Sequence, residues 1–546
     1  MRLHFKNRNG KNQMVLTAGL WSYIILLLMR IPLSGIIGDV GMGLFAPAFE
    51  LFWLVSLFTS YSMMRAMSGV IRYRVKREQY KNAGKVFRSA FFINLFVSIV
   101  LAAVLVILAR VIADILVLET LSRMAIIAAA AAIVLAALIG TFRGYFNGYG
   151  LGVLVAHSQY IEKIAMLVCV LVCGNIFHGY GEKVSALLKA ENYAYAYGAL
   201  GAMIGVMLSQ MITVLYLLVI YVIYAGTLKA RQIQDSSKRM ETQYSLQRIL
   251  LNSSIPIALI AVGSNVFMLI DQRLFNYCMN RKEMGEMRTA LWGGYYSRFA
   301  VVIGIGAALV CLSVYSMTGR ISSAYEKEEY RAMRERIGRA VRRLCIVAFP
   351  LAIYLAVLAE ALVKCLNRKG AADEVSVWVQ KGAVIIVLYG FSFLFGQLLY
   401  KLHMVRELVL TTLITMIVHV VLAYLLVQKA LLGADGIIYS LIICLAVYAA
   451  FNFLLIAKNL KYRQEWIRDV AFPAAAACVS GLVVMLSGRL LLEPVGALLT
   501  IVIACLVGLV IYVLLLMALR VIGEAELAGM PFGFFFVMLG RNMRIL

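Results

Sequence analysis

Apolar runs of about 20 residues recur along the whole chain, and they constrain its fold more than any other feature. A run of that length, wound as a helix, crosses the hydrocarbon core of a bilayer. Hydrophobic residues make up 63% of the 546 and charged residues only 14%, which excludes a soluble domain. A transmembrane β-barrel would instead show short alternating segments. The sequence therefore predicts an all-α polytopic membrane protein.

We expect about fourteen spanning helices, one for each apolar run. Their approximate bounds are 14–37, 42–64, 89–110, 121–142, 152–175, 193–225, 250–276, 288–318, 341–364, 377–400, 407–428, 433–457, 470–488 and 495–519. The first run follows a basic, polar segment, but it is too long for the hydrophobic core of a signal peptide. We therefore expect it to remain in the protein as the first spanning helix.

Basic residues gather in alternate connecting segments, and this pattern gives the orientation. The segments rich in lysine and arginine are 65–88, 229–248, 320–343 and 458–468. Cytoplasmic loops carry the excess of positive charge in membrane proteins, so we place these segments on the cytoplasmic side. An even number of helices then leaves both termini in the cytoplasm. The net charge of +25 has the same origin, with anionic lipid as its partner, and does not indicate nucleic-acid binding.

The connecting segments are too short to hold a folded soluble domain, so the helices alone divide the chain. The polar segment 226–249 falls near the middle of a twelve-helix core. We predict that it is a cytoplasmic linker between two six-helix lobes, residues 1–225 and 250–457, related as a repeat. Two further helices occupy 458–519, and the tail 520–546 is expected in the cytoplasm.

A few basic residues interrupt the apolar runs, and they are candidates for binding an anionic substrate. An ionised side chain at membrane depth is costly and usually faces a watery cavity or a partner. Arg30 lies in the first helix just before Pro32, which is expected to kink that helix. Arg298 lies near the middle of the eighth helix, where snorkelling or pairing with Asp271 is its alternative. Arg65, at the cytoplasmic end of the second helix, is the weaker candidate.

The acidic residues leave two interpretations open. Glu50 is placed to pair with Arg30 across the first two helices, and such a pair would be purely structural. Asp271 is a candidate for binding a proton or sodium ion, or for a salt bridge. Arg273 lies two residues further on and so points to a different side of the helix. Glu162, on the fifth helix, is expected to hold helices together more than to contact substrate.

Other polar residues carry weaker signals. Glu360 and His419 are expected near helix ends or on packing surfaces. The nine cysteines are scattered through apolar stretches and are expected to be small buried thiols, not metal ligands or disulfides. The sequence shows no pair of catalytic carboxylates outside the membrane, no metal-ligand cluster and no GxxxxGK[ST] phosphate-binding loop. We therefore expect no catalytic activity, no metal and no cofactor, so uphill transport would need a Na⁺ or H⁺ gradient or the membrane potential.

An ordered set of short motifs covers the length of the chain. Its members are Met29–Phe45 (MRIPLSGIIGDVGMGLF), Ala83–Ala90 (AGKVFRSA), Arg143–Gly148 (RGYFNG), Ser158–Ile164 (SQYIEKI), Ser254–Asp271, Arg320–Met333 and Gly523–Gly533. Together they resemble the MOP (multidrug/oligosaccharidyl-lipid/polysaccharide) exporter superfamily. The resemblance is to the branches of stage V sporulation protein B-like, polysaccharide (Wzx-type) and MurJ-like flippases. It implies a V-shaped, two-lobed transporter that works by alternating access.

The resemblance also implies a substrate and its site. Members of these branches flip or export undecaprenyl-diphosphate-linked oligosaccharides across the bacterial cytoplasmic membrane. Arg30 and Arg298 match positions where cavity arginines are proposed to meet the diphosphate, which guanidinium groups bind in a bidentate manner. The last two helices are expected to form a groove for the lipid tail. The implied partners are membrane lipids, the polyprenyl-diphosphate glycan and enzymes of envelope synthesis, and we expect a monomer.

Two alternatives remain from the residues themselves. The first is a MATE-like multidrug or cation antiporter, whose cavity should be acidic or neutral. Arg30 and Arg298 argue against it, whereas Glu50 and Asp271 keep it open. The second is a membrane-embedded glycan polymerase, which the missing extracytoplasmic catalytic loop disfavours.

Overall fold

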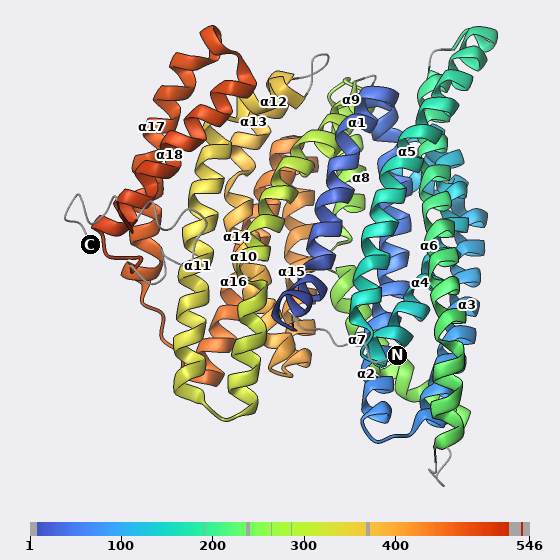
Figure 1. Ribbon diagram of the computed structural model, residues 1–546. Helices are drawn as coiled ribbons and strands as arrows, with labels where there is room; N and C mark the ends of the chain where they lie inside the picture. The colour runs from blue at the N-terminus through green and yellow to red at the C-terminus, as the bar shows by residue number, and fades with distance from the viewer. Residues whose placement is uncertain are drawn as a thin grey trace. The chain divides into compact units, whose positions relative to one another are not determined.

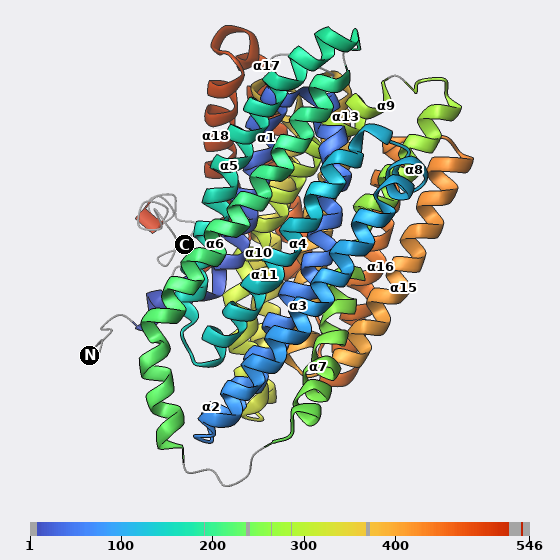
Figure 2. The same cartoon turned by 90° about the vertical axis from the view of Figure 1, so that its right-hand side faces the viewer.

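Helices are the regular secondary structure of the computed structural model, which contains no strand over the residues that it describes (Figures 1 and 2). The described residues are 8–190, 192–235, 241–263, 265–285, 287–366, 372–523 and 537–538. Thirteen of their segments are long and apolar enough to cross a membrane. The prediction of an all-α polytopic membrane protein is confirmed.

The first of these segments, Thr17–Val75, contributes two passes. Its helix α1 (Arg8–Ser56) is broken at Gly38, where φ is 69° and ψ is 175°, a conformation that glycine adopts without strain. Arg30 and Glu50 would lie about 30 Å apart on a straight helix. Their side chains are instead 3.2 Å apart, so the chain folds back at Gly38. The passes then agree in number with the helices expected from the sequence, and the break falls at Gly38 and not at Pro32.

Contacts group the chain into two compact units. The first holds Met1–Ser297 with Thr412–Ile437, and the second holds Arg298–Thr411 with Ile438–Leu546. This grouping is not the six-helix division expected from the sequence, which stays a prediction. Residues 236–240 of the expected linker, and most of the tail 520–546, lie outside the described residues.

Helices α1 to α9 of the first unit are labelled in Figure 1. Besides α1, this unit contains η1 (Leu57–Tyr61), α2 (Ser62–Val75), α3 (Tyr80–Val111), η2 (Ile112–Val117), η3 (Thr120–Ser122), α4 (Arg123–Gly148), α5 (Gly152–Leu188), α6 (Asn192–Gln234), α7 (Gln243–Gly263), α8 (Phe267–Arg281), α9 (Arg288–Gly294) and η5 (Tyr424–Lys429). The short segment η4 (Tyr295–Phe299) and helix α15 (Val405–Ala423) cross the boundary between the units.

Polar contacts explain why α7 belongs to the first unit. Arg74 of α2 pairs with Glu241, just before α7 begins. The Lys81 backbone N–H donates to the Asp235 carboxylate, 2.7 Å away, at the end of α6. The two ends of the segment that follows α6 are therefore tied to the turn between α2 and α3.

The second unit contains the remaining helices. They are α10 (Ala300–Glu326), α11 (Tyr330–Val357), α12 (Ala359–Leu366), α13 (Ala372–Gly382), α14 (Val384–Lys401), most of α16 (Ala434–Leu460), η6 (Ile467–Ala471), α17 (Phe472–Val495) and α18 (Ala497–Ala518). Two polar contacts attach η6 and α17 to α11. The Tyr354 hydroxyl lies 2.9 Å from the Ser480 hydroxyl, and Arg342 Nε lies 2.6 Å from an Asp469 oxygen. Both η6 and α17 are therefore packed against α11.

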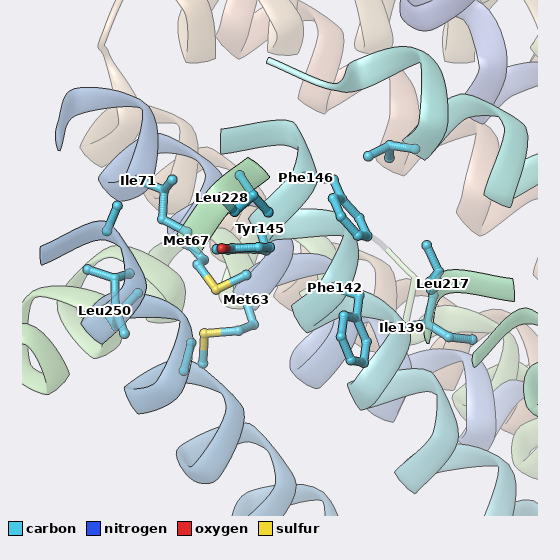
Figure 3. Packing of buried hydrophobic residues seen from close by; sticks show 14 of the residues in the cluster. Met63, Met67, Ile71, Ile139, Phe142, Tyr145, Phe146, Leu217, Leu228 and Leu250 are labelled. Atoms are coloured by element: carbon cyan, nitrogen blue, oxygen red, sulfur yellow. The ribbon is translucent and has the colours of Figure 1, made fainter. Parts of the chain in front are cut away.

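A stripe of glycines lets α4 approach α2 and η1 closely. Gly140, Gly144 and Gly148 are four residues apart and share one face of α4. A Cβ atom at Gly140 would lie 2.4 Å from the Ser60 carbonyl oxygen and 2.5 Å from the Ser60 Cα. Small residues allow backbones to come together in this way in membrane proteins. The adjoining apolar core joins α2, α4, α6 and α7, with Met63, Met67, Phe142, Tyr145, Leu217 and Leu250 among its members (Figure 3).

We expect Gly140→Ala to destabilise the protein by about 1–3 kcal/mol, the range for overpacking a tight contact. The two nearest atoms that the new methyl group would meet belong to the backbone of Ser60, so a change of the Ser60 rotamer does not relieve the clash. The matched control is Gly69→Ala on α2, because nothing lies within 4 Å of a Cβ atom there. Thermal melting of both variants in detergent tests the prediction, and equal melting temperatures would contradict it.

Candidate functional site

Arg30 and Glu50 form a buried ion pair across the two arms of α1. Arg30 Nη2 lies 3.2 Å from Glu50 Oε1, and the two residues are 5% and 7% exposed. The Tyr296 hydroxyl donates to the same carboxylate oxygen at 2.8 Å. Arg30 Cζ lies 3.7 Å from the centre of the Tyr296 ring, within the range of a cation–π contact. The pairing of Arg30 with Glu50 that the sequence left open is therefore present.

The pair leaves Arg30 with unused capacity to donate hydrogen bonds. A guanidinium group has five N–H donors. Arg30 Nε is buried and has no hydrogen-bond partner among the described residues. Glu50 already accepts from both Arg30 and Tyr296 at one oxygen. The arrangement holds the guanidinium in place and leaves Nε without an acceptor among the described residues.

Close packing of α9 against α1 positions Tyr296. A Cβ atom at Gly293 would lie 1.8 Å from the Asp39 carbonyl oxygen, and one at Gly43 would lie 2.1 Å from the Thr289 carbonyl oxygen. The two backbones therefore touch where these glycines stand. Tyr296 follows Gly293 by less than one turn, so this contact directs its hydroxyl group toward Glu50.

Asp271 of α8 pairs with His419 of α15 in the first unit. Asp271 Oδ1 lies 2.9 Å from His419 Nε2, and the two residues are 4% and 0% exposed. His419 Nδ1 has no partner in the part of the chain that the structure describes. The ring of Phe267 lies 4.3 Å from the imidazole ring. From the sequence we expected His419 near a helix end or on a packing surface, and we did not expect it to pair with Asp271. The sequence does not show that α8 and α15 are neighbours.

The other candidates from the sequence lie in different surroundings. Arg273 is exposed, and its guanidinium donates to the Ile115 carbonyl oxygen at 2.8 Å. It points away from the buried Asp271, as their spacing predicted. Arg65 is half-buried with its guanidinium 5.5 Å from the Tyr61 ring. Because α2 continues to Val75, Arg65 lies about 15 Å before the end of the helix and not at it. Arginine and lysine are good helix formers, which explains the longer helix.

Arg298 is the first residue of the second unit and is 1% exposed. Arg30 belongs to the first unit, so their joint contact with one substrate stays a prediction. Asp271 pairs with His419 within the first unit.

Glu162 of α5 joins two cations. Its Oε2 lies 2.7 Å from Arg143 Nη1, and its Oε1 lies 2.5 Å from Lys163 Nζ. Arg143 belongs to α4, so the carboxylate links two helices. The sequence singled out Arg143 only as part of the RGYFNG motif, because it stands near the end of its helix. No group of three or more His, Cys, Asp or Glu side chains suited to a metal occurs within the described ranges.

Comparisons with known proteins agree with this architecture. The model of the polysaccharide biosynthesis protein family matches residues 11–318. Stage V sporulation protein B of Bacillus subtilis is 20% identical over 519 residues, which cover 95% of this chain and 96% of that protein. The lipid II flippase MurJ, in an inward closed conformation, matches with a TM-score of 0.63 at 13% identity, covering 91% of this chain and 96% of that one. An inward-facing multidrug resistance MATE family transporter of the MOP superfamily matches with a TM-score of 0.58 at 15% identity, covering 81% and 94%.

Proposed function

The chain belongs to the polysaccharide biosynthesis protein family, within the MOP superfamily, and from this membership we propose that it flips a lipid-linked oligosaccharide across the cytoplasmic membrane. The proposed substrate is an undecaprenyl-diphosphate-linked glycan, either a polysaccharide repeat unit or a precursor like lipid II. Its head group would pass through the protein by alternating access while the polyprenyl tail stays in lipid.

The observation that carries this proposal is the buried Arg30. Its guanidinium is held by Glu50 and Tyr296, yet its Nε has no acceptor in the described part of the chain. A diphosphate offers acceptor oxygens of opposite charge, and charge-assisted hydrogen bonds to guanidinium groups are strong. Arg298 is proposed as the matching group in the second unit, and Arg65 as a further contact nearer the cytoplasm.

The multidrug or cation antiporter is less well supported. The matching family model is one for polysaccharide biosynthesis and covers residues 11–318. A cation would also have to approach two buried arginines. Catalysis is not proposed, because the matched structures are a flippase and a transporter.

We place the protein in the cytoplasmic membrane of a bacterium with both termini in the cytoplasm. The support is the positive charge of alternate connecting segments. A monomer that receives its substrate from enzymes of envelope synthesis fits this placement.

The Asp271–His419 pair is the proposed site of ion coupling. A buried carboxylate with an imidazole partner can exchange a proton, and such pairs mark proton pathways in membrane proteins. Imidazole nitrogen favours a proton over Na⁺, which as a hard cation prefers oxygen ligands. The proposed coupling ion is therefore H⁺.

We expect an imposed pH gradient to change the translocation rate of the wild-type protein, and Asp271→Asn to remove that response. The amide keeps the size of the side chain but does not take up a proton near neutral pH. Initial rates in proteoliposomes measure the effect, with Arg273→Gln as the control because Arg273 is exposed. A rate that follows a Na⁺ gradient and ignores the pH gradient would exclude proton coupling.

The function itself is tested with purified protein in liposomes. A fluorescent undecaprenyl-diphosphate saccharide is placed in both leaflets, and a membrane-impermeant quencher is added outside. We expect the protected fraction to fall faster than in protein-free liposomes. Transport of a lipophilic cation without any movement of the glycan would instead support the antiporter.

A further inference from the structure

A second buried cluster in the first unit carries an excess of positive charge. It consists of Arg143 on α4 with Glu162 and Lys163 on α5, whose side chains are 9%, 9% and 10% exposed. Two cations therefore share a single carboxylate away from bulk water. Burying an unbalanced charge is strongly unfavourable unless another group compensates it.

The carboxylate of Glu162 has little capacity left. Its Oε2 accepts from Arg143 Nη1 at 2.7 Å. Its Oε1 accepts from Lys163 Nζ at 2.5 Å and from Gln210 Nε2 at 3.3 Å. Glu162 therefore cannot satisfy the remaining donors of the two cations.

Donors of both cations remain available. Arg143 Nε donates to the Ser158 hydroxyl at 2.8 Å, but Arg143 Nη2 is buried and has no partner among the described residues. Within the described ranges Lys163 makes one hydrogen bond, to Glu162, and its Nζ lies 5.7 Å from the centre of the Trp53 ring. An ammonium group has three donors. The cluster thus presents buried, positively charged donors that lack an acceptor.

The cluster lies close to the Arg30 site along the second arm of α1. Trp53, which contacts Lys163, follows Glu50 by three residues, so the two share one face about 4.5 Å apart along the axis. Arg143 stands about 7.5 Å before the end of α4. The predicted orientation puts the turn between α4 and α5 on the cytoplasmic side. The cluster therefore lies between the cytoplasmic end of the unit and Arg30.

We propose that Arg143 and Lys163 form a binding site for a phosphate or diphosphate group, occupied before that group reaches Arg30. Such a group would accept from Arg143 Nη2 and Lys163 Nζ and would balance the excess charge. This inference rests on the proposed function, because it assigns the site to the diphosphate of the lipid-linked glycan. An ordinary anionic phospholipid offers the same phosphate chemistry, so the test must separate the two sources.

The test measures lipid binding to the full-length protein in nanodiscs of zwitterionic lipid. The probes are undecaprenyl diphosphate, undecaprenol and phosphatidylglycerol. We expect the wild type to bind undecaprenyl diphosphate at least about tenfold more tightly than undecaprenol or phosphatidylglycerol. One pair of charge-assisted hydrogen bonds is strong enough to produce a difference of this size. Binding of phosphatidylglycerol as tight as that of the diphosphate would assign the site to bulk lipid and overturn its place on the substrate path.

Three variants separate binding from structure. Arg143→Gln and Lys163→Met should each weaken diphosphate binding about tenfold. Glu162→Gln removes the competing carboxylate and should tighten diphosphate binding, even where it lowers the melting temperature. A cluster with a purely structural role would lower the stability of all three variants and leave diphosphate affinity unchanged in the folded fraction.

The same preparations distinguish failure of this inference from failure of the proposed function. One outcome is that the wild type translocates the diphosphate glycan while folded Arg143→Gln and Lys163→Met bind undecaprenyl diphosphate as tightly as the wild type. That pair of results would contradict the binding site and would support the proposed function. If the wild type binds undecaprenyl diphosphate no better than undecaprenol and moves no glycan, the binding site and the proposed function are both contradicted.

Discussion

Arg30→Ala should lower the initial rate of diphosphate-glycan translocation by about tenfold to a hundredfold. A hydrogen bond to a charged group contributes about 1.5–3 kcal/mol, and each 1.4 kcal/mol corresponds to a factor of ten. Arg30 is buried, held by Glu50 and Tyr296, and keeps a donor without a partner among the described residues. Arg30→Lys keeps the charge but loses the planar fork, so it should retain part of the rate.

The structural explanation for Arg30 is tested by a double substitution. Arg30→Ala alone leaves Glu50 as a buried carboxylate without its cation, and that loss alone is destabilising. Arg30→Ala with Glu50→Gln removes both charges and relieves this defect. If Arg30 only neutralises Glu50, the double variant should recover transport. If Arg30 binds the diphosphate, the double variant should regain stability and stay as slow as Arg30→Ala.

Gly293→Ala should cause the largest loss of stability among the substitutions considered. The added Cβ atom would lie 1.8 Å from the Asp39 carbonyl oxygen, 2.7 Å from the Asp39 carbonyl carbon and 2.9 Å from the Gly43 nitrogen. All three are backbone atoms, so α9 must separate from α1. The cost should exceed the about 1–3 kcal/mol of ordinary overpacking.

The same substitution tests whether the packing of α9 against α1 positions Tyr296 beside Glu50. Movement of α9 would carry Tyr296 away from Glu50 and break the hydrogen bond between them. Size-exclusion profiles and melting temperatures measure the loss of folded protein. The control is Gly179→Ala on α5, where nothing lies within 4 Å of the new methyl group. Wild-type behaviour of Gly293→Ala would show that the contact between α1 and α9 is looser than the structure has it.

The sequence predicted the features that depend on local pattern. Apolar run length gave the spanning helices, and the short connection around Gly38 made the Arg30–Glu50 pair foreseeable, since neighbouring helices joined by a tight turn must lie side by side. The different directions of Asp271 and Arg273 followed from their spacing on one helix.

Features that depend on which helices become neighbours could not be predicted. The partner of Asp271 is His419, 148 residues away, and neither residue carries a periodic signal that names the other. The sequence did not single out Tyr296, whose hydroxyl group donates to the buried Glu50 carboxylate. The sequence pointed to Arg143 only through the RGYFNG motif, because its partner Glu162 lies on another helix.

The charge of the head group is the centre of this account, and one comparison tests it most directly. The same wild-type proteoliposomes are supplied with a polyprenyl-diphosphate saccharide or with the corresponding glycosylated polyprenol, which has no phosphate. The buried guanidinium of Arg30 predicts rapid movement of the diphosphate lipid and a rate for the neutral lipid no higher than in protein-free liposomes. Equal rates for the two lipids, or faster movement of the neutral one, would contradict recognition through the diphosphate.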